Sequence, residues 1–141
     1  MKDILSHKTA VRLKETGFPQ PEPEAGQMWY YTRFPDGTAK KNVLCILAHE
    51  YPYQDNLEAL PLDGGERICN PRNTQIFAPT AVDILRELSS DCVLGTKTLG
   101  GWICGSWRLI SSDHMKFFVG GMHDKNPAEA AAETWLKLNE K

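Results

Sequence analysis

Three of the four histidines lie next to an acidic residue, which is the pairing that general acid–base chemistry uses. The pairs are His49-Glu50, Asp113-His114 and His123-Asp124. A histidine and a carboxylate act together only within hydrogen-bond reach, yet neighbouring residues on a strand point to opposite faces. An aspartate in a turn bonds to the nearby backbone instead. A hydrolase that uses one of these pairs is therefore an alternative interpretation, and the sequence favours a protein without catalytic residues or a cofactor.

Cysteine, histidine and glycine spacing also fails to match known metal or phosphate sites. The four cysteines, Cys45, Cys69, Cys92 and Cys104, are scattered and form no CxxC pair. Cys45 and His49 would align on a helix, but residues 43–48 have the composition of a strand. The pairs Gly64-Gly65, Gly100-Gly101 and Gly120-Gly121 lie outside any phosphate-loop pattern. We expect no bound metal, and we expect these glycines to form turns and bulges.

The aromatic run in residues 28–34 offers binding chemistry rather than catalysis. On a strand, Met28, Tyr30 and Phe34 share one face, and Trp29 and Tyr31 share the other with Arg33 beside them. Either both faces are covered, or one exposes Trp29, Tyr31 and Arg33 as an interaction patch of the residue types that concentrate binding energy. Such a patch could also stack single-stranded bases. Trp107-Arg108 and Lys116-Phe117-Phe118 repeat this combination.

Charge and hydropathy narrow the class of partner. The 141-residue chain has a net charge of −2 and a pI near 6.1, so it lacks the broad basic field of a nucleic-acid-binding protein. We therefore expect no nucleic-acid partner, although a local basic cluster would permit one; its members would be Arg12, Lys14, Arg33, Lys40 and Lys41. The chain has no secretory signal and no apolar run near the roughly 20 residues of a membrane span. We expect a cytoplasmic protein with no membrane partner.

Three helices are predicted by their capping residues. Ser6 can cap a helix that ends near Thr16, where Gly17 supplies a left-handed residue. Thr80 can cap a second helix. Asn126, Pro127 and Glu129 predict the start of the third helix, with Glu129 at the position of a capping box.

Strands fill most of the remaining chain. The composition predicts strands over residues 27–34, 43–48, 92–97, 102–110 and 115–120. Residues 50–78 are too long for a plain loop in a compact domain, so they should hold short strands that the sequence does not place, with Ile68 and Ile76-Phe77 as candidates. The expected fold is a single α+β domain over residues 1–141, with about three helices packed on antiparallel sheet in the order α-β-β-(β)-α-β-β-β-α.

Three segments resemble those of short uncharacterised proteins encoded by bacteriophages and prophages. Residues 77–85 (FAPTAVDIL) resemble an "aPTxxelL" helix opening, and residues 126–138 (NPAEAAAETWLKL) resemble an "xPeEAxaxxWLxL" closing helix. Residues 13–21 (LKETGFPQP) resemble the "LKExGFPQP" opening of the same proteins. The strand, glycine and helix at the end of the chain also resemble those of HicB-like antitoxins. The first resemblance carries no catalytic residues to this sequence.

Together these features predict a small phage or prophage accessory protein that acts by protein–protein interaction. Its partner is an unidentified protein, which could be a second copy of the chain. The alternatives are an antitoxin-like or nucleic-acid-binding module and, as above, a hydrolase.

Overall fold

The computed structural model describes residues 4–33, 41–49, 57–66, 68–69, 75–96, 100–123 and 125–140. The predicted α+β class is confirmed, with three helices and two antiparallel sheets in roughly the expected order. Contacts divide the chain into two compact units: Met1–Gly17 with Pro79–Lys141 (unit 1), and Phe18–Ala78 (unit 2). The single domain over residues 1–141 stays a prediction, and each unit is described by itself.

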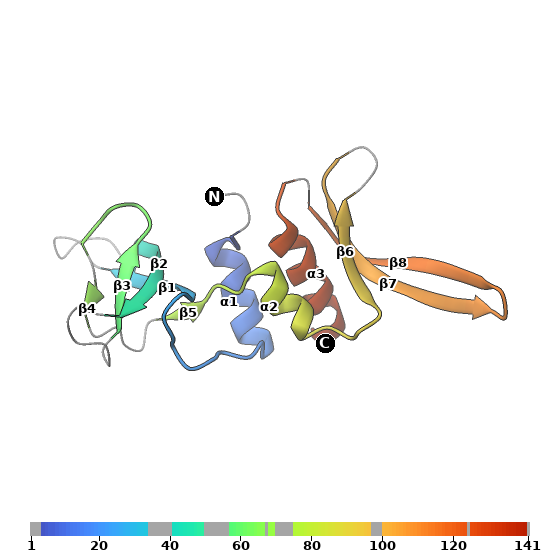
Figure 1. Ribbon diagram of the computed structural model, residues 1–141, viewed down its shortest axis with the longest axis horizontal. Helices are drawn as coiled ribbons and strands as arrows, with labels where there is room; N and C mark the ends of the chain where they lie inside the picture. Colours follow the sequence, from blue (N-terminus) through green and yellow to red (C-terminus); the bar gives the residue numbers. More distant parts are fainter. Residues whose placement is uncertain are drawn as a thin grey trace. The chain divides into compact units, whose positions relative to one another are not determined.

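Unit 2 is built on a five-stranded antiparallel sheet (Figure 1). Its strands are β1 (Met28–Arg33), β2 (Lys41–His49), β3 (Leu57–Pro61), β4 (Ile68–Cys69) and β5 (Ile76–Phe77). Their spatial order is β4-β3-β2-β1-β5. The predicted strands at 27–34 and 43–48 are confirmed, and β3, β4 and β5 are the short strands expected between residues 50 and 78. The turn expected at residues 35–37 lies outside the described residues.

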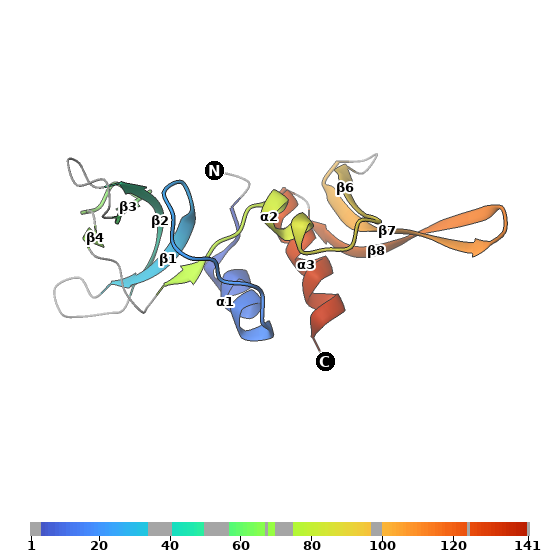
Figure 2. The ribbon, with the colours of Figure 1, turned by 60° about the horizontal axis from the view of Figure 1, so that its bottom comes forward.

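Unit 1 combines all three helices with a three-stranded antiparallel sheet (Figures 1 and 2). The helices are α1 (His7–Thr16), α2 (Ala81–Arg86) and α3 (Pro127–Asn139). The strands are β6 (Cys92–Thr96), β7 (Trp102–Ser111) and β8 (His114–His123), with β7 in the centre. α3 covers one face of this sheet, and β7 and β8 continue beyond it as a long hairpin (Figure 1).

The predicted caps form, with one correction. The side chains of Ser6, Thr80 and Asn126 each accept hydrogen bonds from the first turn of their helix, and Gly17 is left-handed with φ of 100°. The capping box expected from Glu129 does not form. Its carboxylate accepts from the Ser6 backbone N–H at 2.8 Å and the Thr9 hydroxyl at 2.7 Å, so a contact with α1 replaces the local one.

The glycine pair in β8 lets α3 approach the sheet. A Cβ on Gly120 would lie 2.4 Å from Thr134 Cγ2, and one on Gly121 would lie 2.3 Å from the Ala130 carbonyl oxygen. The β7–β8 register shifts at this point, since Gly105 pairs with Val119 and Cys104 with Gly121. The expectation of a bulge at Gly120-Gly121 is confirmed, and the bulge directs two successive positions toward the helix.

Candidate protein-interaction surface

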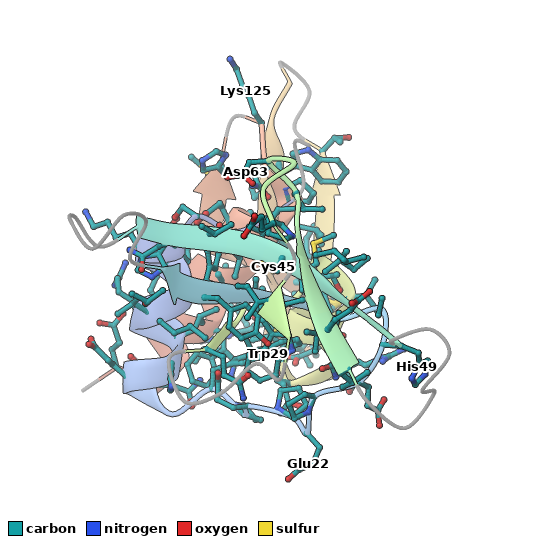
Figure 3. All side chains as sticks on the ribbon, turned by 90° about the vertical axis from the view of Figure 1, so that its left-hand side faces the viewer. Glu22, Trp29, Cys45, His49, Asp63 and Lys125 are labelled. Atoms are coloured by element: carbon teal, nitrogen blue, oxygen red, sulfur yellow. The ribbon has the colours of Figure 1, made fainter. Side chains whose placement is uncertain are left out.

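The aromatic residues of β1 form core rather than an exposed patch. Trp29 and Tyr31 are each only 2% exposed, which is the covered alternative of the sequence prediction. The Trp29 ring lies 5.2 Å from that of Phe77, and its indole N–H donates to Gln27 Oε1 at 3.0 Å. Figure 3 shows Trp29 among the side chains of the sheet. An interaction patch at Trp29 and Tyr31 would need side chains that the fold has buried, so this assignment is corrected.

Tyr31 is held in that core as a neutral phenol. Its hydroxyl donates to Gln75 Oε1 at 3.1 Å. Burial raises the pKa of Tyr31 to about 12, and the nearby Cys45 thiol adds to the increase. Arg33 ends β1, and its side chain lies outside the described atoms. The aromatic strand thus stabilises unit 2 instead of presenting a surface.

The histidines of the three acid pairs lie in separate places. His49 is exposed at the end of β2 in unit 2, at the periphery of Figure 3. His114 begins β8 beside the hairpin turn and is also exposed. His123 ends β8, where its Nδ1 accepts the backbone N–H groups of Lys125 at 3.2 Å and Asn126 at 3.0 Å. Glu50 and Asp124 lie outside the described residues.

His123 lines a depression of about 220 Å³ whose other polar groups are paired with one another. Arg12 bonds Glu140 at 2.6 Å, and Lys137 bonds Glu133 at 3.3 Å, as the i, i+4 spacing of that second pair favours. The nitrogen of His123 that accepts two backbone N–H groups is engaged in starting α3. The position of His123 therefore suits a structural role at the start of α3 rather than proton transfer. The Arg12–Glu140 pair also offsets one charge of the basic cluster considered above.

The described cysteines do not form a metal site. Cys45 is buried in β2 and His49 is exposed at its end, because the segment is a strand rather than a helix. Cys104 is buried against α3, and burial raises the pKa of its thiol. Among the described residues, no group of three potential ligands is placed to hold a metal ion.

Most of the exposed large hydrophobic side chains among the described residues of unit 1 lie on the sheet face turned away from α3. Strand alternation and the β6–β7–β8 register place eight apolar side chains on this face. We call them the apolar face: Val93, Ile103, Trp107, Leu109, Met115, Phe117, Val119 and Met122. Six of the eight are between 45% and 65% exposed. A monomeric protein rarely leaves so continuous an apolar surface in water.

Cross-strand pairs make the apolar face continuous along the hairpin. Trp107 is directly opposite Phe117, with ring centroids 5.2 Å apart, and Leu109 is opposite Met115. The end of the Phe117 ring also lies 3.0 Å from where a Cβ of Gly105 would be, so the ring covers that glycine. These contacts hold the aromatic rings in place while leaving Trp107 51% exposed. The face is therefore ordered by its own strand pairs before anything covers it.

The other face of the hairpin has a different chemistry. Near the bulge it packs on α3, where Thr134 Oγ1 lies 3.3 Å from the Cys104 carbonyl oxygen. Farther out, Arg108 and Lys116 are paired across the strands and hold their charges 4.9 Å and 5.6 Å from the Phe118 ring. The two faces therefore separate an apolar surface from a basic one on a single hairpin.

A second depression, of about 190 Å³, lies where this basic face meets α3. The Ser89 hydroxyl donates to the Asp91 carboxylate there, which lowers the pKa of Asp91. Arg108 lines the same depression and contributes to that shift. Ser89, Asp91 and Arg108 therefore interact with one another in this depression.

The signal for the apolar face was present in the sequence at Trp107-Arg108 and Lys116-Phe117-Phe118. Residues 107, 109, 115, 117 and 119 are all apolar, at every second position of two strands joined by a turn. Alternation of this kind predicts one apolar face. It does not say whether that face or the other lies under a helix, and in this fold the helix covers the other.

Comparison with models of protein families, with curated proteins and with solved structures finds nothing that matches this chain. The helices within the described ranges are too short or too polar to cross a membrane.

Proposed function

We propose that this chain is a small accessory protein, encoded by a phage or prophage, that acts by binding protein through the apolar face. One observation carries the proposal: eight apolar side chains share a sheet face on which the strand register places no ionisable residue among those described. Interface cores are depleted in charge and enriched in aromatic residues and methionine. Trp107, Phe117, Met115 and Met122 fit that composition.

The phage or prophage origin rests on the resemblance of the helix-forming segments. Residues 126–138 form α3 from its first turn almost to its end, and residues 77–85 contain the Thr80 cap and most of α2. Residues 79–85 and 126–138 belong to unit 1, Phe77 and Ala78 belong to unit 2, and neither segment contributes a side chain to the apolar face. The origin and the binding surface are thus separate parts of the proposal, and gene neighbourhood tests the first.

The binding surface is tested by two substitutions on opposite faces of the hairpin. Leu109→Glu places a charge on the apolar face at a position that is 65% exposed, so the fold should tolerate it. Phe118→Glu is the matched control because Phe118 is 37% exposed on the basic face, beside Arg108 and Lys116. The wild-type chain and both variants serve as bait for proteins from a lysate of the host cell.

We expect a protein that the wild type and Phe118→Glu retain and Leu109→Glu loses, with a dissociation constant at least roughly tenfold weaker for Leu109→Glu once that partner is purified. Equal retention by all three baits would contradict a role for the apolar face. Retention of no protein, together with no self-association, would refute the proposed function.

Nucleic acid is a second candidate because of the basic face. Two cations beside one exposed aromatic ring are the elements of a base-stacking position on single strands. A gel shift with single-stranded DNA or RNA at low salt tests this candidate. Binding that Phe118→Glu abolishes and Leu109→Glu preserves would favour it, and no shift at low salt would remove it.

A further inference from the structure

We propose that a second copy of this chain covers the apolar face, in a twofold symmetric dimer whose three-stranded sheets pack face to face. This inference rests on the proposed function, since it identifies the protein that the apolar face binds. In such a dimer the same surface meets itself, so every contact occurs twice. The surface must then be self-complementary in charge, shape and area.

Charge favours a copy of the same surface. A partner with its own charge pattern is selected by complementary charges, but the apolar face offers no ionisable side chain among its eight members. An uncharged apolar surface meets itself without repulsion. Interfaces between identical chains are also more apolar than those between transient partners, which are only about as apolar as ordinary surface.

The exposed area of the apolar face also favours a second copy of the chain as its partner. Six of the eight side chains are about half exposed, and together they present on the order of 550 Å² of accessible surface. Two copies would bury roughly 1,100 Å² from these residues alone, just above the size of about 1,000 Å² that a specific interface needs. The partly exposed Ile103 and Phe117 and the backbone around Gly95 and Gly105 add to that area.

The basic residues select face-to-face packing over pairing at the strand edges. Two sheets packed face to face lie about 10 Å apart and leave their outer faces in solvent. Arg108 and Lys116 would remain on those outer faces, away from the partner. Pairing β8 with β8 of a second copy would instead set the exposed Lys116 side chains of two chains along one shared edge. Twofold packing of the apolar faces avoids this repulsion.

Sedimentation equilibrium of the purified chain from about 1 to 100 μM tests the proposal, because interfaces at the small end of the size range belong to the weak, transient class. Leu109→Glu and Trp107→Glu should each weaken the dimer at least roughly tenfold, because each buries two charges in an apolar interface. Phe118→Glu should change the dissociation constant by less than about twofold. Circular dichroism of each variant shows whether it folds.

Tryptophan fluorescence of the wild-type chain gives a second measurement of self-association. Trp107 is half exposed in one copy and would be covered in the dimer, so dilution through the dissociation constant should shift the emission to longer wavelength. Trp29 and Trp135 are buried, and Trp102 lies on the sheet face that carries α3, so this change should be lost in a Trp107→Phe variant.

The outcomes separate this inference from the proposed function. A wild-type chain that is monomeric at every concentration overturns the dimer, and so does a Phe118→Glu variant that dissociates as readily as Leu109→Glu. If the monomeric wild-type chain captures a host protein that the Leu109→Glu variant does not capture, the proposed function stands with a different partner. If Leu109→Glu changes neither self-association nor the capture of host proteins, both the dimer and the proposed function are wrong.

Discussion

Replacing Gly121 with alanine should destabilise unit 1, because β8 passes α3 at that residue with no room for a side chain. The added Cβ would lie 2.3 Å from the Ala130 carbonyl oxygen and 2.8 Å from Glu133 Cβ. Both neighbours belong to one helix, so relief requires that α3 move away from the sheet. Overpacking of this kind costs about 1–3 kcal/mol, and the loss of glycine flexibility in the unfolded chain returns about 0.4–1 kcal/mol. The mid-range values of these two terms give a net loss of about 1.3 kcal/mol.

Chemical denaturation measures this loss as the change in the free energy of unfolding at one fixed protein concentration. The matched control is Gly95→Ala on β6, where an added Cβ meets no atom within 4 Å. Gly95→Ala should leave stability unchanged or raise it by up to about 1 kcal/mol. If Gly121→Ala is no less stable than Gly95→Ala, α3 does not pack on β8 as closely as the structure shows.

Three further predictions concern single side chains. Glu129→Gln should lower the free energy of unfolding by about 1–2 kcal/mol, because the Glu129 carboxylate accepts hydrogen bonds from Ser6 and Thr9 at the start of α1. Glu133→Gln on the exposed side of α3 should lower it by only about 0.2–0.5 kcal/mol. Urea titration of both variants measures the difference. The Tyr31 phenol stays neutral in the folded chain up to about pH 12, and its stabilising contribution is complete below pH 10 and is lost as the pH rises from about 10 to 12. Thermal unfolding across that range should show a steeper fall for the wild type than for Tyr31→Phe. Burial raises the pKa of the Cys104 thiol, so Cys104 should react more slowly with a thiol reagent than the partly exposed Cys92, and mass spectrometry of early labelled peptides would contradict this if Cys104 reacted first.

Local chemistry decided which parts of the fold could be predicted. The cap at Thr80 depends on residues three positions apart, and the helix start predicted there is confirmed. The structure adds a capping box between Thr80 and Asp83 that the sequence analysis did not predict. Glu129 satisfied the same local rule, yet the structure uses it to bind α1, whose Ser6 lies 123 residues away in sequence. A pattern of neighbours cannot rank a local hydrogen bond against one made by a distant segment.

The apolar face could not be identified from the sequence for a similar reason. Trp29 and Trp107 both lie on predicted strands, and local composition treats them alike. One is 2% exposed and the other is 51% exposed. Coverage of a sheet face is a property of the tertiary fold, so the pattern could predict a face but not its exposure.

The contact between Glu129 and α1 has a consequence for the order of folding during synthesis. Unit 1 is assembled from two separate parts of the chain, with residues 18–78 between them. At about 5–20 residues per second, a ribosome that has made Ser6 needs roughly 6–25 s to reach Glu129. Throughout that interval α1 has no α3 to bind, whereas every strand pair of unit 2 is made within residues 28–77 and is complete earlier. We therefore expect the intervening unit to fold first and the apolar face to form last, when the end of this sequence reaches its beginning.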